Sequence, residues 1–508
     1  MSVGKSLPHD SARLHVTGQA KYIDDIPTPN GTLHLAFGLS EVAHGDITSI
    51  DLDAVRAADG VVSVYSADDF DHVPDCSPSP LEDEPLLATG TVHFLGQPVF
   101  LVVATSHLAA RKAARLGKIT YAEKPAIFSY EEALAADARF EDGPRIYTKG
   151  DPAQAIETAP HVIHGQIDMG GQERFYLEGQ AALATPLEGG DVLVNSSTQH
   201  PTEIQHKVAH ALHIPMHAVR VETRRMGGGF GGKESQGNWL AIACAIAARD
   251  TGRPCKMRYD RDDDMMVTGK RHDFRISYTV GYDDSGKIAG IEFVQMTRCG
   301  WAIDLSIPVA DRAMLHADNA YNLENARIES HRLRTNTQSA TAYRGFGGPQ
   351  GVLGIERVMD HIAADLDLDP ADVRSVNYYA DMGDEPARGQ TTPYGMPVTD
   401  GIMHAMSAKH LADADYKARK EAIKAWNAQS PILKKGIGIS PVKFGISFTL
   451  THLNQAGALV HVYQDGSIQL NHSGTEMGQG LFQKVAQVAA SEFGVSMDVI
   501  KITATDTA

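Results

Sequence analysis

The sequence predicts an α+β protein built from several domains. The chain has 508 residues, and at this length we expect about three hydrophobic cores. Segments with the two-residue period of strands alternate with segments of helical spacing along the whole chain. Stretches rich in Gly and Pro separate these segments into units. We expect a first domain at residues 1–125, a linker at 126–149, a second domain at 150–395 and the start of a third at 400–508.

The first domain combines strand-like and helical patterns and shows no recognisable catalytic or binding site. Residues 33–37 and 99–104 predict strands, and residues 107–116 have helical spacing. In the later domains, strands are expected at 219–223, 274–280, 442–449 and 458–462, and helices at 201–213, 239–247, 349–366, 401–427 and 481–493.

Composition limits the classes of partner. The net charge is −17, from 63 acidic and 46 basic residues, which disfavours nucleic acid or an anionic membrane surface. No apolar run reaches membrane-spanning length and no signal peptide is visible, so we expect a cytoplasmic protein without a membrane partner. The cysteines are too scattered for zinc or iron–sulfur spacing, so any redox centres must lie on another chain: Cys76, Cys244, Cys255 and Cys299.

The most informative stretch is residues 225–234, which holds five glycines together with Phe230 and Glu234. It lies between an alternating run at 219–223 and a helical pattern that begins near Trp239. Glycines accept positive φ and admit a ligand close to the backbone, while a helix N-terminus offers free N–H groups. A cofactor or anion cradle is therefore favoured over a purely structural turn.

A phosphate-binding P-loop is an alternative for the same stretch. Residues 227–233 fit the first seven positions of that pattern, ending in Lys233. Glu234, however, occupies the position where Ser or Thr should bind magnesium, and its carboxylate would repel phosphate. The P-loop interpretation is therefore disfavoured.

Two more Gly-rich stretches, at 342–350 and 474–480, also precede helical patterns. Together with residues 197–199, 225–234 and 443–449, they resemble the molybdopterin-binding subunit of the xanthine dehydrogenase and aldehyde oxidase family. The order and spacing of the motifs resemble that family along nearly the whole chain. The resemblance implies an N-terminal α/β hammerhead domain followed by molybdopterin-binding domains of mixed sheets and helices.

The resemblance implies a molybdenum hydroxylase that converts hypoxanthine to xanthine and then urate, with water as the oxygen source. The implied cofactor is molybdenum-molybdopterin. Electrons would pass to 2Fe-2S clusters and FAD on a partner subunit, with NAD as the final acceptor, in a heterotetramer. An aldehyde or other N-heterocycle oxidoreductase, and a catalytically inactive truncated subunit, remain alternatives.

The same resemblance assigns residues to the substrate. Glu234 and Arg312 would act in catalysis by binding opposite parts of a purine, and Arg312 would stabilise charge on the ring carbonyl. Phe346 and Phe448 would hold the flat ring between them, and Thr449 would contact it. Aldehyde oxidases carry apolar residues at the positions of Glu234 and Arg312. Carbon monoxide dehydrogenases place a cysteine in the loop at 343–346, where this chain has none.

The cofactor would be held by five residues. Gln199, Phe230 and Arg344 would lie at the molybdenum, Gly231 would donate its backbone N–H to the oxo ligand, and Gln479 would bind the pterin. No position here matches the family's general-base glutamate. Because family members continue well past the equivalent of Ala508, we expect this sequence to be an N-terminal part of a longer subunit.

Overall fold

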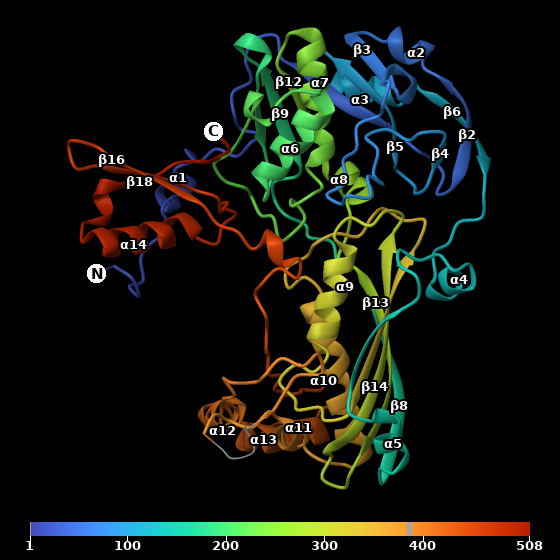
Figure 1. Cartoon of the computed structure of the whole chain (residues 1–508), viewed down its shortest axis with the longest axis vertical. Helices are drawn as coiled ribbons and strands as arrows, with labels where there is room; N and C mark the ends of the chain where they lie inside the picture. Colours follow the sequence, from blue (N-terminus) through green and yellow to red (C-terminus); the bar gives the residue numbers. More distant parts are fainter. Residues whose placement is uncertain (1, 384–388) are drawn as a thin grey trace.

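A computed structural model describes residues 2–383 and 389–508. It confirms an α+β architecture that contains four sheets of eight, five, three and three strands. The eight-stranded and five-stranded sheets form two lobes, one above the other in Figure 1. The C-terminal strands and helix α14 project to one side, next to the N-terminal segment. Among the described residues, no helix combines the length and the apolar character needed to cross a bilayer.

The upper lobe joins residues from both ends of the chain in one sheet. Its order is β19-β11-β10-β9-β12-β1-β5-β3. Strand β1 pairs in parallel with β12, so the sheet crosses the expected boundary between the first two domains. The strands are β1 (Leu33–Leu39), β3 (Val61–Ser66), β5 (Pro98–Ala104), β9 (Ala181–Pro186), β10 (Val192–Ser196), β11 (Val219–Thr223), β12 (Cys255–Arg258) and β19 (Thr505–Asp506).

Helices and a small sheet surround this eight-stranded sheet. Helices α6 (Pro201–Leu212) and α7 (Asn238–Thr251) pack on each other and on the sheet, and their apolar faces belong to its main core. Helix α3 (His107–Ala114) lies on β1 and β5. The remaining elements of this lobe are α2 (Asp53–Arg56), α8 (Arg261–Val267) and the sheet β4-β2-β6, formed by β4 (Thr91–Val92), β2 (Gly45–Asp51) and β6 (Lys118–Glu123).

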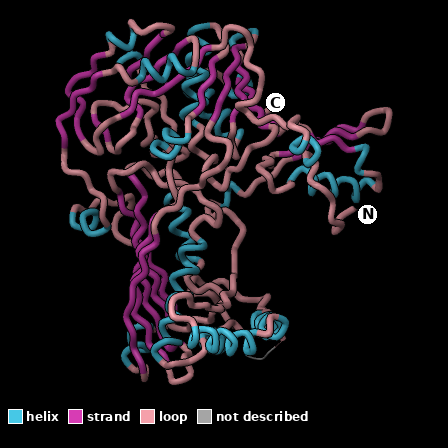
Figure 2. Tube along the Cα trace, turned by 180° about the vertical axis from the view of Figure 1, so that it is seen from behind, coloured by secondary structure: helices cyan, strands magenta, loops and turns pink. Residues whose placement is uncertain are grey.

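The lower lobe is a five-stranded sheet whose long strands are evident from behind in Figure 2. Its order is β7-β15-β14-β13-β8. Helix α10 packs on β13 and β8, and α9 packs on β15, which closes a second core. The elements are α5 (Pro152–Glu157), β8 (His161–Met169), β13 (Asp273–Tyr282), β14 (Ile288–Gly300), α9 (Ser306–Leu315), β15 (Ala326–Arg334), α10 (Gly348–Asp365) and α11 (Pro370–Asn377).

Residues 126–149, which were expected to form a linker, include two short elements. They contain α4 (Tyr130–Ala135) and β7 (Arg145–Lys149). Strand β7 pairs antiparallel with β15 and so completes the edge of the lower sheet. The Gly and Pro residues of this stretch lie in the turns between the two short elements.

The C-terminal region departs from the sequence prediction at two places. The helical pattern at 401–427 forms two helices, α12 (Met403–Asp413) and α13 (Tyr416–Gln429), because Asp415 adopts a left-handed φ of 48° between them. Residues 442–449 form no strand and lie against α9 instead. The other elements are α1 (Ala12–Val16), β16 (Ala458–Val462), β17 (Ile468–His472), α14 (Leu481–Phe493) and β18 (Ile500–Ile502).

Candidate active site

The three Gly-rich stretches meet in space. A Cβ on Gly231, whose φ is 92°, would lie 2.8 Å from the carbonyl carbon and oxygen of Ala342. The backbone N–H of Arg344 donates to the carbonyl of Phe230 over 2.8 Å, which joins the first two turns. The N–H of Met226 donates to the carbonyl of Glu476 over 2.8 Å, which joins the first turn to the third. Glycine is required at 231 because any side chain would force the first two turns apart.

The second and third turns lead directly into helices, and the first is separated from its helix by two further turns. Helix α10 begins at Gly348 and α14 at Leu481, directly after the second and third turns. Helix α7 begins only at Asn238, several residues after the first turn. This start agrees with the helical pattern that was expected from near Trp239. Two further turns intervene, closed by Gly232 N–H to Gly229 O at 2.8 Å and by Asn238 N–H to Ser235 O at 3.0 Å.

The side chain of Gln199 lies against the first Gly-rich turn. Its Oε1 accepts from the N–H of Gly231 at 2.8 Å, and its own N–H donates to the carbonyl of Lys233 at 2.6 Å. A Cβ on Gly229 would lie 2.6 Å from Oε1, so glycine is needed there too. The Gly231 N–H expected to face an oxo ligand is thus bound to Gln199. Among the described residues, Nε2 of Gln199 donates no hydrogen bond, which leaves that NH₂ group for a ligand.

Lys233 is a structural residue, which contradicts the P-loop alternative. Its side chain is 0% exposed, and Nζ lies 3.0 Å from Oε2 of Glu178. The same carboxylate accepts from the N–H of Gly227 at 2.8 Å and, through Oε1, from that of Ile23 at 3.0 Å. Burial lowers the pKa of Lys233, and Glu178 opposes that shift. An ammonium group held in this way cannot reach a phosphate outside the turn.

A cavity of about 760 Å³ opens beside these turns. Three expected site residues line it: Gln199, Glu234 and Phe448. Met477 of the third turn also reaches it. Most of the remaining wall is apolar and comes from residues 78–81, 303–308 and 450–453. An apolar cavity with a few polar groups is typical of sites for small flat ligands.

Glu234 is the unpaired acid of this cavity. Among the described residues, no group donates a hydrogen bond to its carboxylate, and the side chain is only partly exposed. Burial raises its pKa from 4.5 to about 7, against the lowering effect of His200. Glu203 and Asp304 raise it further, and Arg174 lowers it. Near neutral pH this group can therefore either donate or accept a hydrogen bond.

Sequence reasoning missed the polar neighbours of Glu234. His200 Nδ1 lies 3.1 Å from Oε2 of Glu203 at the start of α6. Asp304 has a left-handed φ of 39° and accepts from Ser235 Oγ at 2.6 Å and Gln236 Nε2 at 3.1 Å. Burial raises the pKa of Asp304 to about 6. The adjacency of His200 to Gln199 was the only sequence signal for this group.

Arg174 is a second missed residue, and it supports the contact between the first two turns. Its guanidinium is buried and donates from Nε to the carbonyl of Ala342 at 3.0 Å. It also donates to the carbonyl of Gly269. A Cβ on Gly232 would collide with the Arg174 side chain at 2.1 Å. The segment at 170–178 thus supplies both Arg174 and Glu178 to the turns.

Arg312 and the two phenylalanines lie close together, but not as a ring-sized slot. The rings of Phe346 and Phe448 have centroids 5.0 Å apart at 50°, which leaves no room for a third ring between them. Arg312, only 3% exposed on α9, donates from Nη1 and Nη2 to the carbonyls of Gly445 and Ser447. Of these residues Phe448 alone lines the cavity.

The other expected site residues lie at the margin. Thr449 donates from Oγ1 to the carbonyl of Pro308 at 3.1 Å. The side chain of Arg344 is exposed and has no hydrogen bond or ion pair among the described residues. The amide of Gln479 folds back on its own turn: Oε1 accepts from Met477 N–H at 2.7 Å, and Nε2 donates to Thr475 O at 2.9 Å. Gln479 must therefore turn outward to reach a pterin.

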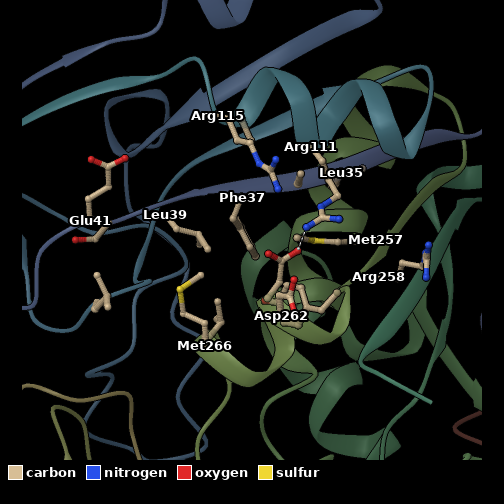
Figure 3. A pocket seen from close by; sticks show the side chains of 17 residues that line it. Leu35, Phe37, Leu39, Glu41, Arg111, Arg115, Met257, Arg258, Asp262 and Met266 are labelled. Atoms are coloured by element: carbon tan, nitrogen blue, oxygen red, sulfur yellow. Dashed lines mark ion pairs between the residues drawn. The ribbon is translucent and has the colours of Figure 1, made fainter. Parts of the chain in front are cut away.

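A second cavity, of about 540 Å³, lies in the upper lobe between α3, β1 and α8 (Figure 3). It contains none of the expected site residues. Arg111 on its wall forms ion pairs with Asp260 and, at 3.0 Å, with Asp263. This cavity is separate from the Gly-rich turns.

Comparison with known proteins gives three family matches. Residues 17–125 match the a/b hammerhead domain of aldehyde oxidase and xanthine dehydrogenase. Residues 139–378 and 409–508 match two molybdopterin cofactor-binding domain families. Among solved structures, quinoline 2-oxidoreductase from Pseudomonas putida 86 aligns with a TM-score of 0.88 at 25% identity, covering 100% of this chain and 67% of its own. Aldehyde oxidoreductase from Desulfovibrio gigas aligns with a TM-score of 0.84 at 25% identity, covering 99% and 56%.

The fold and the three joined turns are those of a molybdopterin-binding protein. The chain belongs to the xanthine dehydrogenase/aldehyde oxidase family. It is 41% identical to xanthine dehydrogenase 1 of Arabidopsis thaliana over 100% of its length, and 39% identical to xanthine dehydrogenase of Drosophila subobscura over 99%. It spans 37% of the length of each of these relatives.

The residues present fit a molybdopterin cofactor. Glycines keep the first turn close to its neighbours, because a Cβ on Gly229 would meet Gln199 and a Cβ on Gly231 would meet Ala342. The NH₂ group of Gln199 and the side chain of Arg344 are uncommitted donors among the described residues. A donor-rich, glycine-lined cradle suits an anionic, oxygen-rich ligand.

Proposed function

We propose that this chain forms the molybdopterin-binding part of an enzyme that hydroxylates purines, taking hypoxanthine to xanthine and then urate. One observation carries the proposal. Gln199 of the cofactor cradle, the unpaired carboxyl group of Glu234 and the ring of Phe448 all line one largely apolar cavity. The names of the 41% and 39% identical relatives, both xanthine dehydrogenases, support the same substrate class.

The chain's own residues would hold the cofactor at the inner end of this cavity. Gln199 Nε2 would donate to an oxygen ligand of the metal, while its Oε1 stays fixed by Gly231. Phe230 and Arg344 would remain joined through their backbone, with the Arg344 side chain free for the anionic part of the cofactor. When bound, molybdopterin supplies the metal centre that transfers water-derived oxygen to carbon and accepts two electrons. The side-chain amide of Gln479 would give up its hydrogen bonds to Met477 and Thr475 in order to bind the pterin ring.

Substrate recognition would depend on Glu234 and Phe448. A purine edge carries both N–H donors and ring-nitrogen acceptors, and a carboxyl group with a pKa of about 7 can pair with either. Phe448 offers a ring face or edge on the wall of the cavity. Thr449 follows it on the same segment, where Oγ1 is bound to Pro308.

Arg312 would be the second polar group for the substrate. Its guanidinium carbon lies 5.8 Å from the centroid of Phe346, beside the ring that touches Phe448. Two of its nitrogens are bound to backbone carbonyls, and Nε is buried with no partner in the described part of the chain. A direct contact with the substrate would require one of these bonds to be exchanged.

Electrons would leave through 2Fe-2S clusters and FAD on a partner subunit, with NAD as the final acceptor, in a cytoplasmic heterotetramer. The four cysteines of this chain are buried and free, at positions far apart in the sequence. The general-base carboxylate is likewise proposed to lie outside these residues. Oxidation of an aldehyde or another N-heterocycle is the second candidate, supported by the names of the aligned quinoline 2-oxidoreductase and aldehyde oxidoreductase structures.

Purine turnover by the intact enzyme, with every co-purifying subunit, tests the proposal. Glu234→Ala and Arg312→Ala should each lower kcat/KM for hypoxanthine by at least about tenfold, the loss expected for one charge-assisted contact. Glu188→Ala, at an exposed acid in the turn between β9 and β10 that does not line the cavity, should leave turnover unchanged. Full turnover of purines by both site variants would reject the assignment, and turnover of quinoline or aldehydes alone would favour the second candidate.

A further inference from the structure

The segment that carries Phe448 is fixed along one face of α9. Residues 442–449 were expected to form a strand, but they pair with no strand and contact side chains and carbonyls of the helix instead. In Figure 1 this orange-to-red part of the chain passes close to α9 on its way to the C-terminal sheet. What holds it in place therefore determines where Phe448 lies in the cavity.

The contacts follow a regular register. Gly445 is bound by His316, Ser447 by Arg312, and Thr449 by Pro308. Two residues of extended chain cover about 6.6 Å, and four residues of α-helix cover about 6 Å, so the two periods match. The segment thus runs antiparallel to α9, and every second residue faces the helix. Phe448 lies between two of these contacts, at Ser447 and Thr449.

His316 completes this register by binding the backbone in one tautomer. Its Nε2 accepts from the N–H of Gly445 at 3.0 Å, so that nitrogen must lack a proton. Its Nδ1 lies 2.8 Å from the carbonyl of Arg312, so that nitrogen must carry the proton. The ring is 4% exposed, and burial lowers its pKa to about 4. Both nitrogens of a neutral imidazole are therefore satisfied only with the segment in place.

Two further contacts keep the segment beside the cofactor turns. Asn319 brackets its start, donating to Pro441 O at 2.8 Å and accepting from Lys443 N–H at 2.9 Å. Phe444 packs where a Cβ on Gly348 would lie 2.7 Å from its ring, at the first residue of α10. The His316 ring is 5.1 Å from the Phe444 ring. His316 thus contacts the segment, the helix and the end of the second Gly-rich turn.

We infer that His316 is a positioning residue for substrate binding: in its Nδ1–H tautomer it binds Gly445 and so places Phe448 on the wall of the cavity. Arg312 acts on the same residue, since it donates to the Gly445 carbonyl while His316 accepts from the Gly445 N–H. The effect of His316 on substrate binding rests on the proposed function. Its effect on the position of residues 443–449 does not.

Hydrogen exchange of backbone amides in residues 443–449, measured by mass spectrometry, tests the inference on the intact protein. His316→Leu removes the acceptor and should speed exchange in this segment at least about fivefold, the worth of one hydrogen bond. His316→Gln keeps an acceptor oxygen and should restore slow exchange. His164→Leu removes an exposed histidine bonded to Thr279 on the lower sheet and should change nothing in the segment. If His316→Leu does not fold, His316→Met replaces it in the comparison with His316→Gln.

Two further readouts separate this inference from the proposed function. Molybdenum content should be the same in wild type and both variants, because His316 neither lines the cavity nor takes part in the contact between Gln199 and Gly231. KM for hypoxanthine should rise in His316→Leu and return in His316→Gln, with kcat changed less. Equal exchange in wild type and His316→Leu would overturn the inference. Wild-type protein without purine turnover would reject the proposed function, while the exchange comparison would still decide whether His316 holds the segment.

Discussion

The backbone N–H of Gly231 donates a 2.8 Å hydrogen bond to Oε1 of Gln199. This bond links two motifs that are 32 residues apart and turns the amide of Gln199 so that Nε2 is its free end. The same glycine touches the carbonyl of Ala342 in the second Gly-rich turn. Gly231 is therefore the residue that joins the first Gly-rich turn to Gln199 and to the second Gly-rich turn.

Gly231→Ala should separate the first two turns. The new methyl group would meet Ala342 at 2.8 Å, and the residue would keep a φ of 92°. We expect a loss of about 3 kcal/mol in the free energy of unfolding, from strain and displaced backbone together. Gly143→Ala is the matched control, because its φ is also positive and nothing lies within 4 Å of the new methyl. Equal losses in the two variants, measured by urea unfolding, would mean that the turns do not touch.

Lys233→Met should destabilise the fold and leave nucleotide affinity unaltered. It removes the partner of Glu178, a carboxylate that is only 7% exposed, and such a loss costs about 3–5 kcal/mol. Lys409→Met breaks the exposed pair with Asp413 and should cost less than about 1 kcal/mol. Thermal or urea unfolding compares the two. A variant of wild-type stability that has lost ATP binding would support the P-loop interpretation instead.

Glu234→Gln should stabilise the protein at alkaline pH. The folded-state pKa of about 7 exceeds the ordinary value of 4.5, so the folded state resists ionisation. The resulting penalty is absent below pH 4.5, grows as the pH rises toward 7 and stays constant above it. It amounts to about 3 kcal/mol at most. Unfolding free energies should therefore differ by less than about 1 kcal/mol at pH 5 and favour the variant by about 3 kcal/mol at pH 8. Equal stability of variant and wild type at both pH values would contradict the assigned burial of Glu234.

Hydrophobic periodicity predicted the helices whose apolar residues recur at regular helical spacing. Helix α14 has the predicted bounds, and the second and third Gly-rich turns open helices as expected. These features are set by residues that are close in sequence.

The features that were missed depend on residues far apart in the chain. Residues 442–449 alternate like a strand, but the hydrogen bonds that an extended segment needs come from Arg312 and His316 and not from a neighbouring strand. Glu178 and Asp304 gain their importance only from burial against the first turn and its neighbours. Likewise, residues 126–149 looked like a linker because a short edge strand such as β7 is defined by its partner β15.

Molybdenum content tests the central claim most directly. The measurement is elemental mass spectrometry of the protein purified from its own source with all bound subunits. The joined turns and the free NH₂ group of Gln199 predict close to one molybdenum per chain, lost in Gly231→Ala and retained in Gly143→Ala. Folded wild-type protein that contains no molybdenum would contradict the proposal that these turns hold a molybdopterin.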